Sequence, residues 1–268
     1  MLGTFFRAFS RSIGARHPGS RDTGKGNVAP LLLVVRSRPM RRVLLSLLAM
    51  SVCALWPQTS AKRSYPIQLG PRLNVSTTAE LDRRLSAPFP DGVAHPEAVH
   101  SCAEWLAKGG AIPPDAAGPD APALKSAKAQ CLIISELRGA AASRVSHVAD
   151  LKWDEHVFPL LPPQLAVNVS QDAVNAADKA AGRGRGWTDV DRTAAATGLG
   201  PDEIIVKGDG FTERLILWGR GDFDHDGAED LLVQTLDTLT EGSYRNTRLF
   251  VLTRKKANAK LSVAKQVQ

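Results

Sequence analysis

One stretch decides the fold of this chain, and it runs RLILWGRGDFDHDGAEDLLVQTL over residues 214–236. Two short runs rich in Ile, Leu and Val, at 214–218 and 231–236, flank a segment dominated by Gly and Asp. Apolar runs of this length, bounded by turn residues, are typical of strands. The stretch therefore predicts two neighbouring strands joined by an acidic loop.

The acidic loop has the pattern D-x-D-x-D-G-x-x-D over residues 222–230. Carboxylates at alternate positions converge only where the chain curls around a point, and Gly227 supplies the backbone freedom for that curl. Calcium is the expected ion, because it accepts six to eight oxygen ligands in a flexible shell, whereas magnesium requires a strict octahedron. A solvated acidic turn is the alternative. The expected ligands are the carboxylates of Asp222, Asp224, Asp226 and Asp230, and the backbone carbonyl of Ala228.

The loop is not an EF-hand, because Val233 stands where the bidentate Glu should be and the flanks are strand-like. The segment GDFDHDGAEDLLV, residues 221–233, resembles the FG-GAP or VCBS-type repeat of integrin α-chain propellers and many bacterial surface proteins. The resemblance implies calcium ligation by the residues named above. Propellers need several blades, however, and no second copy of the loop occurs in the sequence. A single calcium hairpin in a different small fold is therefore expected, without integrin-like adhesion.

Further short apolar runs at 204–207, 248–253 and 261–265 predict an antiparallel meander over residues 201–268. Residues 62–200 are mainly helical by the same kind of pattern, with helices expected at 96–108 and 123–138. Shorter helices are expected after Thr77, from Ser170 to Gly182 and over 188–196. The predicted fold class is α+β, with the helices first and the sheet last.

Two cysteines, Cys102 and Cys131, fall on the apolar faces of the two longer predicted helices. In an oxidising compartment two such cysteines indicate one disulfide between the helices. Two unrelated buried thiols are the alternative.

Residues 40–61 have the order of a secretory signal peptide: a basic start at Arg41 and Arg42, an apolar run over 43–56, and small residues before a cleavage site after Ala61. Residues 1–39 are then interpreted as an upstream extension from a start codon assigned too early. The alternative is a mitochondrial transit peptide, since Arg and apolar residues interleave there. Cys53 lacks the small residue expected before a lipidated cysteine. Export to the periplasm or outside the cell is the prediction, without a membrane span in the mature chain.

The net positive charge of the chain comes from the predicted leader, because residues 1–61 hold nine Lys or Arg and one Asp. The remainder has 25 basic and 26 acidic residues. A nucleic-acid or anionic-membrane partner therefore loses its main support, and an unidentified envelope or extracellular partner is expected.

Catalytic signatures are weak. The sequence has no G-x-S-x-G elbow and no H-E-x-x-H motif. The clusters Asp154-Glu155-His156 and Asp189-Val190-Asp191 hold titratable groups, which are also common on surfaces. A non-catalytic protein with one structural calcium loop is the leading hypothesis, and a secreted hydrolase of cell-wall or polysaccharide material is the alternative.

Overall fold

The computed structural model describes residues 64–73, 75–112 and 121–268. The predicted signal peptide, its cleavage site and the extension before it lie outside the described residues. In the described part, no helix is both long enough and apolar enough to cross a membrane.

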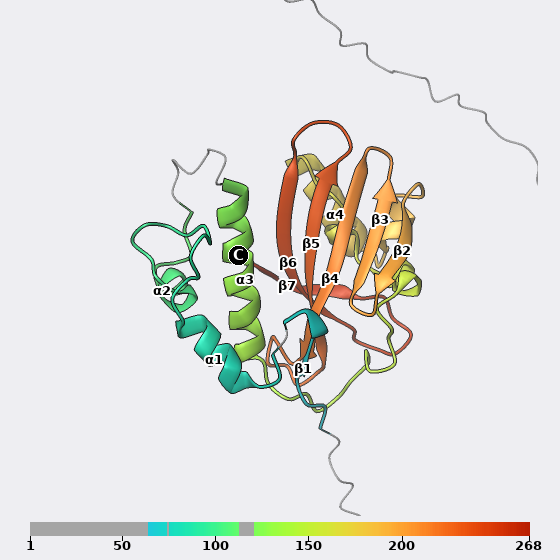
Figure 1. Ribbon diagram of the computed structural model, residues 1–268. Coiled ribbons are helices and arrows are strands. Elements are labelled where there is room, and N and C mark those ends of the chain that lie inside the picture. The colour runs from blue at the N-terminus through green and yellow to red at the C-terminus, as the bar shows by residue number, and fades with distance from the viewer. Residues whose placement is uncertain (1–63, 74, 113–120) are drawn as a thin grey trace, which may run out of the picture. The chain divides into compact units, whose positions relative to one another are not determined.

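An antiparallel sheet forms the centre of the fold (Figure 1). Its strands follow one another in space as in sequence, and each pairs antiparallel with the next. This arrangement confirms the predicted meander and the α+β class. The strands are β2 (Ala195–Gly200), β3 (Glu203–Gly208), β4 (Phe211–Gly221), β5 (Asp230–Leu239), β6 (Arg245–Thr253) and β7 (Ser262–Val267), while β1 (Gln68–Leu69) pairs with the far end of β4.

The N-terminal helices are α1 (Thr78–Ser86), α2 (Cys102–Ala107) and α3 (Ala121–Gly139), preceded by the short 3-10 turn η1 (Pro71–Leu73). Thr77 begins α1, because its side chain accepts a hydrogen bond from the backbone nitrogen of Glu80. A disulfide joins Cys102 of α2 to Cys131 of α3, as the sequence predicted. These two helices and α1 enclose a small core of their own around Trp105.

Helix α3 packs against the sheet as well as against the other helices. Its Ile133 and Leu137 contact a cluster that includes Leu232, Val251 and Val267 of the sheet. The opposite sheet face is covered by the segment that follows α3, and Figure 1 shows α4 on the side of the sheet away from α3. That segment contains η2 (Glu155–Leu160), η3 (Pro163–Leu165), α4 (Gln171–Ala181) and α5 (Trp187–Val190).

Burial on both faces explains the composition of β5. Consecutive side chains point to opposite faces of a strand, so Leu231 and Val233 enter one core while Leu232 enters the other. All three are fully buried. A run of adjacent apolar residues is the pattern expected of a strand covered on both sides.

Two helix predictions need correction. The helix expected over 96–108 begins only at Cys102, because Ser101 caps it by accepting a hydrogen bond from Glu104 N. The helix expected over 188–196 ends at Val190, and residues 195–200 form strand β2. Gly198 and Gly200 therefore lie in an edge strand and do not terminate a helix. Pairing with β3, a tertiary effect, determines this segment.

Candidate metal centre

The acidic loop joins the ends of β4 and β5, with Gly221 directly opposite Asp230 in the last pair of the ladder. Two residues in the loop have positive φ angles, His225 at 64° and Gly227 at 91°. The left-handed conformation at Gly227 is the one predicted for the curl. His225 is exposed.

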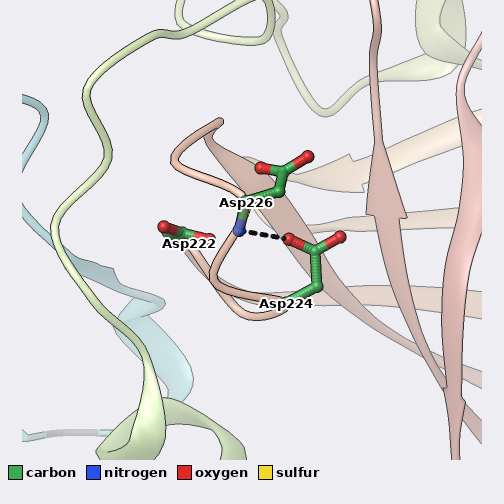
Figure 2. A group of neighbouring side chains, drawn as sticks. All are labelled: Asp222, Asp224 and Asp226. Atoms are coloured by element: carbon green, nitrogen blue, oxygen red, sulfur yellow. Dashed lines mark hydrogen bonds between the residues drawn. The ribbon is translucent and has the colours of Figure 1, made fainter.

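Three carboxylates converge in this loop. One oxygen from each of Asp222, Asp224 and Asp226 can be chosen so that all three lie within 4.8 Å of one another, and Figure 2 shows these side chains along the curl of the chain. Two oxygens that each lie about 2.4 Å from a calcium ion can be at most about 4.8 Å apart. The spacing of the group is therefore compatible with a shared calcium ion.

Backbone amides of the loop shape the carboxylate group. Asp222 Oδ2 accepts a hydrogen bond from Gly227 N at 2.9 Å, Asp224 Oδ1 from Asp226 N at 3.1 Å (Figure 2), and Asp226 Oδ1 from Ala228 N at 2.7 Å. Each bond occupies one carboxylate oxygen and leaves the other oxygen of the same group for a different partner.

Asp222 provides the observation that points to a ligand. The residue is only 4% exposed, and its Oδ1 is buried without a hydrogen-bond partner among the described residues. Leaving a buried charged oxygen unpaired costs several kcal/mol. Arg144 is close to the loop, yet in the described part of the chain it forms no ion pair with these aspartates. A cation bound by Asp222 would remove this cost.

Asp230 has a different environment from the other three aspartates. It is fully buried and does not belong to the group within 4.8 Å. Its Oδ2 accepts a hydrogen bond from Phe223 N at 3.2 Å, and the Thr253 side chain interacts with the same carboxyl group. Burial raises the pKa of Asp230 to about 7, and the charges of Asp224 and Asp226 act in the same direction. The ninth position of the motif is therefore an interior carboxyl, whereas Asp224 and Asp226 are exposed.

The chain after α3 binds the back of the loop. Ala141 exchanges two backbone hydrogen bonds with Asp222, and the amides of Arg144 and Val145 both donate to Gly227 O. The Arg144 guanidinium lies so close to Gly227 that a Cβ there would be 2.5 Å from one of its nitrogens. The loop is thus fixed at its two ends by strands β4 and β5, and residues 141–145 hydrogen-bond to it from outside the hairpin.

The other predicted site residues are not gathered into one site. Asp154 caps η2 by accepting from His156 N at 3.0 Å, whereas Asp189 binds Lys260 and accepts from Gly186 N. Asp154 and His156 line a surface hollow of about 320 Å³ whose lining includes neither Glu155 nor Asp189. The structure therefore gives Asp154 and Asp189 local structural partners.

Four tryptophans lie in the part of the chain that the structure describes, and none of them is exposed. Trp105, Trp153 and Trp187 are buried core residues, and the half-buried Trp218 donates to Gln234 Oε1 at 2.9 Å. His95 stacks on Phe89.

One polar cluster was not predicted from the sequence. Glu213 and Asp237 are buried opposite each other on β4 and β5. Arg248 of β6 bonds both carboxylates and donates to the carbonyls of residues 164–166. The burial of Glu213 could have been predicted from its position in the sequence. Glu213, Leu215 and Leu217 occupy alternate positions of β4, so they share one strand face, and the two leucines place that face in the core.

Comparison with family models, with curated proteins and with solved structures finds no match to this chain.

Proposed function

We propose that the chain is an exported, non-catalytic protein in which one calcium ion at Asp222, Asp224 and Asp226 stabilises the β4–β5 hairpin, with a binding role toward an envelope or extracellular partner. The observation that supports the calcium site best is the buried, unpartnered Oδ1 of Asp222 within a group of three converging carboxylates. The Ala228 carbonyl and Asp230 would complete the ligand set that the FG-GAP-like spacing implies.

We assign the ion a structural role because the loop connects two paired strands and also contacts the segment after α3. Asp222 and Gly227 hydrogen-bond to residues 141–145, and the loop ends in two paired strands. An ion that orders the loop would therefore hold together the hairpin and the chain that leaves α3. Export is supported by the disulfide, since disulfides persist mainly in oxidising compartments.

The calcium site is tested by thermal unfolding of the mature protein in calcium, in magnesium and in a chelator. An ion that binds only the folded state stabilises it by RT ln(1 + [L]/Kd), which is about 2.7 kcal/mol at a concentration 100-fold above Kd. We expect calcium to raise Tm by several degrees and magnesium to raise it less. Asp224→Ala should abolish the rise, and because Asp224 is exposed the variant should still fold.

Asp209→Ala is the matched control. Asp209 is an exposed aspartate in the turn between β3 and β4, on the same sheet but outside the carboxylate group. This variant should keep the full calcium response. Identical melting curves in calcium and chelator, or equal loss of response in both variants, would reject the calcium site.

A further inference from the structure

Two basic stretches that are far apart in the sequence lie at one place on the surface. Residues 183–185 and 254–260 together carry six Lys or Arg and no acidic residue. The first follows α4 and the second connects β6 to β7. Outside these stretches, residues 62–268 carry 19 basic and 26 acidic side chains. The net charge predicted for the mature protein is therefore close to zero although these two stretches form a positively charged region of its surface.

A cavity of about 520 Å³ lies between the two stretches. Arg185, Lys255 and Lys260 line it, and none of its lining residues is acidic. Pro162, Leu261 and Val263 contribute apolar wall. This volume is within the range of sites for small molecules.

One carboxylate, that of Asp189, interacts electrostatically with these cations. Lys260 forms an ion pair with it. The pKa of Asp189 is lowered mainly by the hydrogen bond with Lys260, then by that with Gly186 N, and also by the charge of Arg185. Lys255 forms no ion pair in the described part of the chain. Three cations against one carboxylate leave an excess of positive charge at the cavity.

The backbone fixes the position of Arg185. Gly184 adopts φ of 69° after α4, and Arg185 N donates to Ala180 O at 3.1 Å. This is the six-to-one hydrogen bond of a Schellman helix end. Arg185 therefore projects from a defined turn.

One polar group in the wall lacks a hydrogen-bond partner among the described residues. Gln164 lines the cavity, and its Oε1 is buried without a hydrogen-bond partner among the described residues. The hydroxyl residue Ser262 also lines it. A ligand that carries both anionic and hydroxyl oxygens would match this combination of cations, amide and hydroxyl.

We propose that this cavity binds a phosphate group, carried by a small phosphorylated molecule or by a phospholipid headgroup, through Arg185 and Lys255. Arg forms bidentate bonds to phosphate and Lys acts as a compact charge. Gln164 and Ser262 would contact hydroxyl groups next to the phosphate. The site is separate from the acidic loop and does not depend on calcium.

The proposal is tested by isothermal titration calorimetry, in which glycerol 3-phosphate is added to the mature protein in the presence of a chelator and the heat of binding is measured. A second arm measures co-sedimentation with phosphatidylcholine vesicles that contain or lack phosphatidylglycerol. Binding of glycerol 3-phosphate assigns the site to small ligands, and binding only to the anionic vesicles assigns it to lipid. In either case the double variant Arg185→Gln, Lys255→Gln should bind at least 10-fold more weakly.

The matched control is Lys125→Gln, Lys128→Gln, which removes two positive charges from the lining of a different cavity beside α3. This control should bind like the unmodified protein, and unchanged Tm values in both double variants would show that they fold. No binding in either arm, or equal weakening in the two double variants, would overturn the proposal. Both arms run without calcium, so their result is independent of the calcium test.

Discussion

Glu213 lies directly opposite Asp237 across strands β4 and β5, and both side chains are buried. Arg248 Nε donates to Asp237 Oδ2 at 3.0 Å, and its Nη2 lies 3.4 Å from Glu213 Oε1. One guanidinium thus faces two carboxyl groups. Burial raises the pKa of Glu213 well above its ordinary value of 4.5, and the charge of Asp237 raises it further, while Arg248 opposes the shift.

This pKa makes the free energy of unfolding depend on pH. A raised pKa in the folded state means that the folded protein holds a proton which the unfolded chain releases, so stability falls as pH rises. The contribution of Glu213 is fully present below about pH 4.5 and is lost as pH rises through the raised value. Glu213→Gln should flatten this dependence and unfold at higher urea concentration than the unmodified protein at alkaline pH. Each tenfold difference in proton affinity corresponds to about 1.4 kcal/mol.

Asp237→Asn is the comparison for this prediction. It leaves the Arg248 charge without its closest carboxylate, so it should destabilise the protein by about 3 kcal/mol or more. Urea unfolding from pH 4 to pH 9 measures both effects. An unchanged pH dependence in Glu213→Gln would contradict the assignment of the proton.

Gly219 is required where β1 and α3 approach β4. A Cβ at this position would lie 2.5 Å from Leu137 Cδ2 and 2.8 Å from Gln68 O. Gly219→Ala should therefore lower the free energy of unfolding by about 1–3 kcal/mol, as overpacking does elsewhere. Gly139→Ala, at the end of α3, meets no atom within 4 Å and should be neutral or slightly stabilising. Equal effects of the two substitutions in urea unfolding would contradict the close packing.

The disulfide should stabilise the helices at the N-terminal end of the described chain. It links residues 29 positions apart, and closing a loop of this length stabilises the folded state by roughly 3.5 kcal/mol in the chain-entropy model. The double variant Cys102→Ser, Cys131→Ser should show a loss of this size in urea unfolding. The unfolded, unreduced mature protein should have no free thiol, and detection of two thiols would contradict the bond.

Export predicts a defined mature N-terminus. Cleavage after Ala61 would leave Lys62 as the first residue, which N-terminal sequencing of protein from the native host can read directly. A start near residue 30 would support organelle import in its place, and an intact residue 1 would reject both alternatives.

Local patterns predicted much of this fold. Apolar runs bounded by Gly and Asp located the strands β3 to β7, and the cap at Thr77 located α1. The face of α3 was predicted only in part. Cys131 is buried on the predicted apolar face, together with Leu124 and Ala127, whereas Ile133 and Leu137 are buried against the sheet. A helix that packs on two sides has no single apolar stripe, so its periodicity shows only one of its contacts.

The remaining features depend on pairing between distant segments. Strand β2 is Ala- and Gly-rich and becomes a strand through its neighbour β3. In the loop, spacing predicted the convergence of Asp222, Asp224 and Asp226, but it could not predict that Asp230 would be buried whereas Asp224 and Asp226 are exposed. That difference arises because Asp230 is already the first residue of β5.

Helix α3 contributes to two hydrophobic cores. Its Cys131 face belongs to the core shared with α1 and α2, and its Leu137 face belongs to the core shared with the sheet. The disulfide lies in the first of these cores. Native-state hydrogen exchange should therefore show α2 opening at low free energy after reduction, while the amides of β4 and β5 stay protected until global unfolding.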